Sequence, residues 1–203
     1  ENEGTDEVAR DVTAQNVTTV QVDVGAYSNY SGTVTAPDSE TAQLNVASAV
    51  DDNDAETTKF SGTLRSPDAT SVVAVSQGLL TGGASIEAGN AESVSVTTGQ
   101  SSPTQQDTLT LDTESAAVAD FTLGRSLDIQ GSDLSGVEQL TVNTGGPFVA
   151  ADTNPLTNVN LDSIVTATIG GPAGTSQAFL GNLGTDELTN SIELNAQGLA
   201  ASS

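Results

Sequence analysis

The chain has 203 residues, and its 27 Asp and Glu stand against four Lys and Arg, giving a formal net charge of −23. It contains no Cys and no His, which excludes disulfides, thiolate and imidazole metal sites, and Ser-His-Asp or Cys-His catalysis. Phosphate neutralisation needs clustered Lys and Arg, so the charge also argues against nucleic acid and anionic membranes as direct partners.

The charge indicates a protein that works in concentrated salt. Self-repulsion of this size destabilises a compact chain, and four basic residues are too few to offset it by ion pairs. At about 1 M salt the Debye length falls to about 3 Å, so the repulsion is screened. We therefore predict a halophilic source, with an acidic extracellular bacterial domain as the alternative.

The N-terminal residues 1–16 are polar and acidic, and they predict an arm with at most one turn of helix. From Val17 onward, apolar and polar residues alternate with period two, which is typical of strands with one wet face. The predicted strands are 17–24, 30–36, 42–50, 57–64, 71–75 with 79–80, 93–98, 108–112, 116–123, 137–142, 148–151, 158–161, 163–169, 177–180 and 191–194. Short helical turns are expected at 114–119 and 132–138.

The stretch from Ser163 to Ile169 has the densest run of β-branched residues, and Gly170, Gly171 and Pro172 are expected to end it. Its apolar residues fall at both parities, which is typical of a strand covered on both faces. We therefore expect this segment to be the central, buried strand of the fold.

About ten to twelve short strands with Gly, Pro, Asn or Asp between them predict an all-β fold. We find no internal repeat of fixed period, which argues against a solenoid or a propeller. The expected fold is a single jelly-roll-like barrel or sandwich with extra strands over residues 17–194, between the arm 1–16 and a tail, 195–203. The alternative is two immunoglobulin-like sandwiches joined through the polar loop 99–107.

No metal site is predicted, although one acidic run could hold a hard cation. Carboxylate oxygens are what Ca²⁺ or Mg²⁺ require, and the residues concerned are Asp51, Asp52, Asp54 and Glu56. Counted from Asp52, the run lacks the sixth-position glycine of an EF-hand loop, and Thr63 stands where the bidentate Glu should be. A solvated loop is the simpler interpretation.

No catalytic motif is found, since there is no Gly-x-Ser-x-Gly elbow and no phosphate-binding loop with its Lys. Lys59 has the setting of an edge-strand lysine. Asn16 and Asn29 match the Asn-x-Ser/Thr acceptor pattern. Carboxylate pairs for glycosidase work would have to come from Asp152, Asp162, Asp186 and Glu187.

In this combination of acidic composition and many short strands over the whole chain, the protein resembles the small major capsid proteins of icosahedral, membrane-containing haloarchaeal viruses. Tail-tube and decoration proteins of haloarchaeal tailed viruses are similar in the same respects. The resemblance implies a single upright jelly roll that assembles into capsomers over an internal membrane without inserting into it. It implies no enzymatic activity and a place in the virion.

The expected partners are therefore further copies of the chain or related capsid subunits, with no cofactor beyond non-specific Na⁺, K⁺, Mg²⁺ or Ca²⁺. The two terminal segments are expected to reach onto neighbouring subunits. A cell-surface or adhesive module outside the cell is the alternative function, and a secreted carbohydrate-active enzyme is the second alternative.

Overall fold

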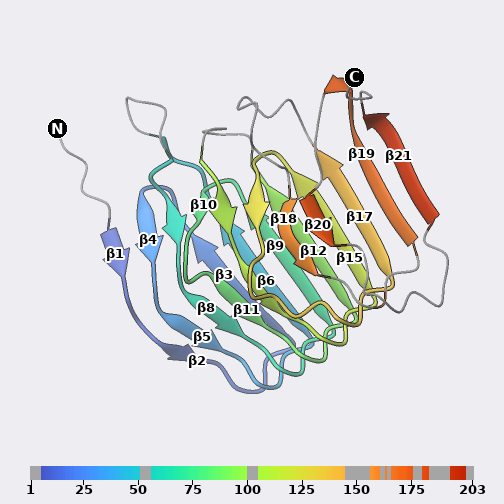
Figure 1. The fold of residues 1–203 in the computed structure, drawn as a ribbon. Helices are drawn as coiled ribbons and strands as arrows, with labels where there is room; N and C mark the ends of the chain where they lie inside the picture. Colours follow the sequence, from blue (N-terminus) through green and yellow to red (C-terminus); the bar gives the residue numbers. More distant parts are fainter. Residues whose placement is uncertain are drawn as a thin grey trace.

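The chain forms a stack of coils, a parallel β-solenoid of about six turns (Figure 1). The structure is a computed structural model, and it describes residues 6–50, 56–99, 105–144, 156–160, 163, 166–175, 180–182 and 193–199. In these residues every regular element is a β-strand, and all pairs of named strands run parallel.

Each complete coil contributes one strand to each of three sheet faces. The wide sheet has eight strands: β3 (Thr19–Val24), β6 (Thr41–Val46), β9 (Ser71–Ser76), β12 (Ser93–Thr98), β15 (Val118–Leu123), β17 (Gln139–Thr144), β19 (Thr166–Thr175) and β21 (Glu193–Leu199). The narrow sheet has five: β2 (Val12–Thr13), β5 (Thr33–Thr35), β8 (Thr63–Arg65), β11 (Ser85–Glu87) and β14 (Thr110–Asp112).

The third face, the split sheet, is divided into two four-stranded parts. The first contains β1 (Asp6–Val8), β4 (Ser28–Tyr30), β7 (Lys59–Phe60) and β10 (Leu79–Leu80). The second contains β13 (Asp107–Thr108), β16 (Leu127–Asp128), β18 (Leu156–Asn160) and β20 (Leu180–Asn182). The two parts meet where β10 contacts β13.

The core forms because successive coils place apolar residues at equivalent positions of their strands. Along β6 the side chains alternate between buried and half-buried, and Leu44 is fully buried. Its neighbours in the ladder are Val22 on one side and Ala74 on the other, both inward as well. Phe60 and Phe121 fill the interior from two different sheets. Stacking coils therefore buries a continuous column of Val, Leu, Ile and Ala.

The all-β class is confirmed, but the jelly-roll barrel and the pair of immunoglobulin-like sandwiches are wrong. Both alternatives require antiparallel strands, whereas the ladders here are parallel. Alternating apolar and polar residues are usually a sign of an antiparallel sheet with one wet face. A solenoid strand also has one wet face, so its alternation is the same.

The prediction that the chain has no solenoid repeat is wrong as well. The wide-sheet strands begin at Thr19, Thr41, Ser71, Ser93, Val118, Gln139, Thr166 and Glu193, so the period varies between 21 and 30 residues. Loops of different length between the strands conceal it from a search for a fixed period. The clearest copies are 31–46 and 61–76, which share Ser-Gly-Thr followed by Pro-Asp.

The strand expected at the centre lies instead near one end of the ladder. β19 is the second-to-last strand of the wide sheet, between β17 and β21. Gly170, Gly171 and Pro172 do not end it, because it continues to Thr175. Residues 164 and 165 lie outside the described residues.

Two further local predictions differ from the structure. The described residues contain no helix, and the expected helical turn at 114–119 runs into β15. The segment expected to be an arm contributes β1 and β2, which pair with β4 and β5 of the same chain. The described part of the expected tail, up to Leu199, belongs to β21. Residues 1–5 and 200–203 are outside the described part.

Candidate functional site

The outer face of the wide sheet is a regular array of small polar side chains. Successive residues of a strand point to opposite faces, so each six-residue strand places three side chains outward. From β3 to β19 these residues are Thr19, Gln21, Asp23, Thr41, Gln43, Asn45, Ser71, Val73, Val75, Ser93, Ser95, Thr97, Val118, Asp120, Thr122, Gln139, Thr141, Asn143, Thr166, Thr168 and Gly170. We call this set the outer face.

The strand register aligns these side chains into three rows across the sheet. The row at the start of the strands joins Thr19, Thr41, Ser71, Ser93, Val118, Gln139 and Thr166. The middle row runs from Gln21 to Thr168, and the last row runs from Asp23 to Gly170. Neighbouring members of a row are spaced by the inter-strand distance of about 4.8 Å. The outer face is therefore a repeating grid of hydroxyl, carboxamide and methyl groups.

Carboxylates are scarce on this face, although the chain has 27 Asp and Glu. Asp23 and Asp120 are the charged members of the set. Asp23 is engaged by its neighbours, since the Gln21 amide donates to its Oδ2 at 2.8 Å and the Asn45 amide donates to its Oδ1 at 2.8 Å. Asp120 is exposed in the middle row, between Ser95 and Thr141.

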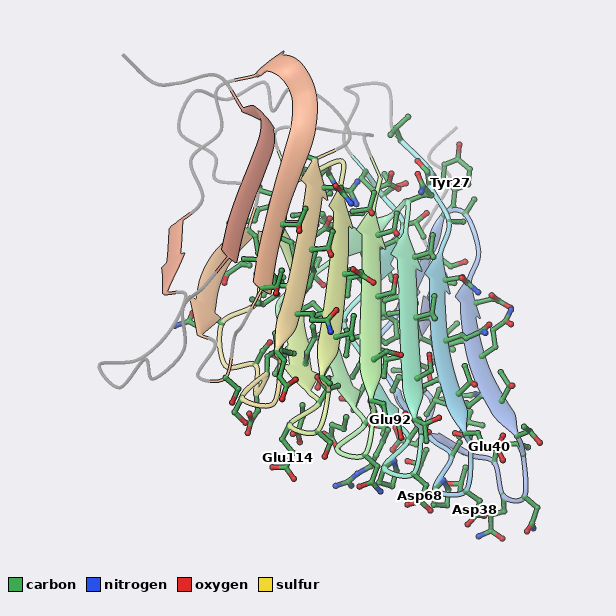
Figure 2. All side chains as sticks on the ribbon, turned by 90° about the vertical axis from the view of Figure 1, so that its right-hand side faces the viewer. Tyr27, Asp38, Glu40, Asp68, Glu92 and Glu114 are labelled. Carbon is green, nitrogen blue, oxygen red and sulfur yellow. The ribbon has the colours of Figure 1, made fainter. Side chains whose placement is uncertain are left out.

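Exposed acids gather instead along one border of the face, where the chain turns from the narrow sheet into the wide sheet. In Figure 2 the wide sheet is seen from outside, and the labelled acids follow its lower border from coil to coil. This acidic ridge consists of Asp38, Glu40, Asp68, Glu92, Glu114 and Glu138, all exposed. Turns with Pro-Asp or Gly-Asn connect the two sheets here, and their small residues such as Ala69 and Ala91 point inward while the acids point outward.

The most polar part of the interior is an ion pair at the break in the split sheet. Arg125 and Asp107 are both fully buried, and Arg125 Nε lies 3.1 Å from Asp107 Oδ2. The guanidinium also donates to the carbonyl oxygens of Gln77 and Gly78. Asp107 Oδ1 in turn accepts a hydrogen bond of 2.8 Å from the Leu80 backbone N–H. The pair thus replaces ladder bonds that β10 and β13 do not make.

A second buried carboxylate lies beside this pair. Glu56 is 2% exposed, and its side chain accepts hydrogen bonds from Ser48 Oγ and from the backbone N–H groups of Ala49 and Thr58. Its own N–H donates to Gln105 Oε1, which ties two loops together at one corner of the solenoid. Burial, and to a lesser degree the charge of Glu56, raise the pKa of Asp107, and Arg125 opposes this rise.

This buried cluster is bonded within the chain and closed to solvent. Its acids are fully or almost fully shielded from solvent, and their oxygens accept bonds from the chain itself. A reacting group would need access to one of them. The functional interest of the molecule therefore lies on its surface.

Of the predicted acidic site residues, the structure describes Glu56, which is buried in the corner cluster. Asp51, Asp52 and Asp54 lie outside the described residues. The four glycosidase candidates, Asp152, Asp162, Asp186 and Glu187, also fall outside them. Among the described residues, no group of three or more acids is arranged to hold a metal ion.

Three other predicted positions are described. Lys59 is not on an edge, because β7 pairs with β4 on one side and with β10 on the other. Asn16 is exposed in a left-handed turn with φ of 57°. Asn29 lies in β4 and is partly buried.

Sequence reasoning missed both the buried pair and the outer face, although signals for each are present. Arg125 is one of four basic residues and lies directly between two apolar strands, a position that calls for a buried partner. The outward positions of the period-two strands are Thr, Ser, Gln and Asn in a chain otherwise rich in acids. A comparison of the outward strand residues, which are mostly uncharged, with the acidic turns and loops reveals the outer face.

Comparisons with protein-family models, with curated proteins and with solved structures found no match to this chain. No helix in the described residues has the length and apolar character needed to cross a bilayer.

Proposed function

We propose that this protein is a non-catalytic structural subunit that assembles with further copies of itself in the virion or another outer layer of a halophilic system. The observation that carries the proposal is the outer face, a broad grid of small uncharged side chains on a chain with net charge −23. A surface that is kept nearly free of carboxylates suits close contact with an equally acidic neighbour. The proposed assembly needs no cofactor other than bulk salt.

The solenoid supports a scaffold role in a second way. Parallel ladders joined coil to coil make a rigid body whose surfaces repeat along its axis. The buried ion pair and the hydrogen bond between the loops at its corner hold this part of the surface in place, and the carboxylates of Asp107 and Glu56 are shielded from solvent. These features suit a building block better than an enzyme.

The experiment is sedimentation velocity with electron microscopy of the purified chain at about 3 M NaCl, followed by stepwise dilution of the salt. Defined oligomers or extended assemblies at high salt are the expected result. A protein that stays monomeric at every salt and protein concentration contradicts the proposal.

An adhesive cell-surface module is the second candidate, favoured by the same grid of hydroxyl and carboxamide groups. Such groups both donate and accept hydrogen bonds, as a neutral glycan requires. Binding of the monomer to neutral polysaccharides in molar salt, measured by co-sedimentation, distinguishes this function from assembly.

A further inference from the structure

We propose that the partner of the outer face is the same face of a second copy, so that two wide sheets pack against each other around a twofold axis. This inference rests on the proposed function and adds which surface makes the contact and what covers it. Three observations support it: the distribution of charge, the hydrogen-bonding character of the face and its area.

The charge distribution favours the outer face over the acidic ridge as a contact surface. The ridge carries one or two exposed carboxylates in each of five successive coils, and another copy of that ridge would repel it. The outer face carries Asp23, which is bonded to Gln21 and Asn45, and Asp120. Contact through this face therefore brings fewer like charges together than contact through the acidic ridge, and molar salt screens the remaining repulsion.

The face is complementary to itself. Hydroxyl and carboxamide groups each donate and accept, so a row such as Ser71, Ser93 and Thr41 can bond to another copy of the same row. A carboxylate-rich surface only accepts and lacks this property. Val73, Val75 and Val118 add apolar area to the grid. An isologous contact of this kind closes at two copies.

The area is close to what a stable dimer needs. The seven strands from β3 to β19 at about 4.8 Å spacing, each at least six residues long at about 3.3 Å per residue, cover roughly 34 by 20 Å, or about 670 Å². A standard stable interface buries about 800 Å² on each partner. The face alone therefore comes close to that value.

The test places two carboxylates in the middle of the face. Val73 and Ser95 are register partners on β9 and β12, and both are outward and half-buried. The variant Val73→Glu/Ser95→Glu should raise the dimer dissociation constant about tenfold or more in 3 M NaCl, because carboxylates would be desolvated without partners. Sedimentation velocity measures the constant, and circular dichroism checks the fold of each variant.

The matched control makes the same change on the narrow sheet. Thr63 and Ser85 are register partners on β8 and β11, also half-buried, so Thr63→Glu/Ser85→Glu adds the same charge in the same geometry off the face. The control should associate like the wild type. If both double variants associate normally, the face assignment is overturned while the proposed function stands. If the wild type is monomeric throughout, both are overturned.

A third variant removes a charge from the face, so it should strengthen association. The fold does not have to accommodate a new carboxylate in this variant. Asp120→Asn removes the exposed carboxylate of the middle row and should lower the NaCl concentration at which half of the chains associate. Glu92→Gln on the acidic ridge removes the same charge off the face and should change that concentration less. An equal or larger effect of Glu92→Gln contradicts the inference.

Discussion

At the level of single residues, the interior contains an ion pair that forms hydrogen bonds to backbone groups where β10 and β13 form no ladder. Arg125 and Asp107 bond to three backbone groups near the start of β10 and to each other. A buried pair of this kind contributes little when complete, but removing one partner leaves an uncompensated buried charge. Stability should therefore respond very differently to single and paired replacements.

The first prediction concerns Arg125→Met, which should lower the free energy of unfolding by about 3–5 kcal/mol because Asp107 loses its counter-charge. Denaturant unfolding in molar NaCl measures it. The double variant Arg125→Met/Asp107→Leu should recover a substantial part of the loss.

The matched control is Arg65→Met, since the Arg65–Glu87 pair lies at the surface with side-chain exposures of 59% and 36%. Exposed pairs contribute about 0–1 kcal/mol. Equal losses for the two arginine variants would show that Asp107 is not an unpaired buried charge in the Arg125 variant.

The second prediction follows from the raised pKa of Asp107. Its carboxyl binds a proton more readily in the folded chain than in the unfolded chain, whose pKa is near the ordinary 3.8. Stability from this group therefore falls as the pH rises from 3.8 through the higher folded-state pKa, and it increases when the pH is lowered through that window.

The variant Asp107→Asn tests this sign. It keeps an acceptor for the Leu80 N–H but cannot titrate, so its stability should depend less on pH just above 3.8 than that of the wild type. Thermal unfolding at a series of pH values in about 2 M NaCl, where surface repulsion is screened equally in both proteins, makes the comparison. Identical pH profiles contradict the assignment.

At the level of the elements, stacked corners limit which residues fit between the split sheet and the narrow sheet. A Cβ at Gly62 would lie 2.3 Å from the carbonyl oxygen of Gly32, and one at Gly32 would lie 2.1 Å from that of Arg10. Successive coils therefore lie in close contact at these glycines, and the Ser-Gly-Thr sequence before β5 and β8 reflects this contact.

The third prediction is that Gly62→Ala destabilises the protein by about 1–3 kcal/mol, because backbone must move to admit the methyl group. Gly82→Ala is the control, since nothing lies within 4 Å of its Cβ position. That change should be neutral or slightly stabilising, through the unfolded state. A comparison of thermal midpoints in molar NaCl that shows equal effects would contradict the close stacking.

At the level of the whole molecule, the net charge of −23 contrasts with the outer face, which carries two carboxylates, those of Asp23 and Asp120. The fourth prediction is that the fold itself needs salt. Circular dichroism should show loss of β-structure as NaCl falls from molar concentrations to about 50 mM, where the Debye length exceeds about 10 Å. Full retention of the spectrum at 50 mM would contradict it.

The sequence alone determined the alternation of wide-sheet strands such as β3, and therefore which side of them faces the core, but it did not reveal β1, β2, β11 or β16. Val20, Val22 and Val24 alternate with polar residues, and all three are buried in β3. Such alternation is a local property of the pleated backbone, so it can be read without knowing the neighbours. Pro37 and Pro67 likewise mark turns from their own fixed geometry.

Only the tertiary structure decided how the strands pair, and therefore which surface matters. Antiparallel and parallel strands with one wet face share the same period of two, and coils whose lengths vary from 21 to 30 residues hide their repeat. Arg125 and Asp107 meet because they occupy the same corner in successive coils, 18 residues apart. The rows of the outer face exist for the same reason, since stacking in register brings side chains together that lie a whole coil apart in the chain.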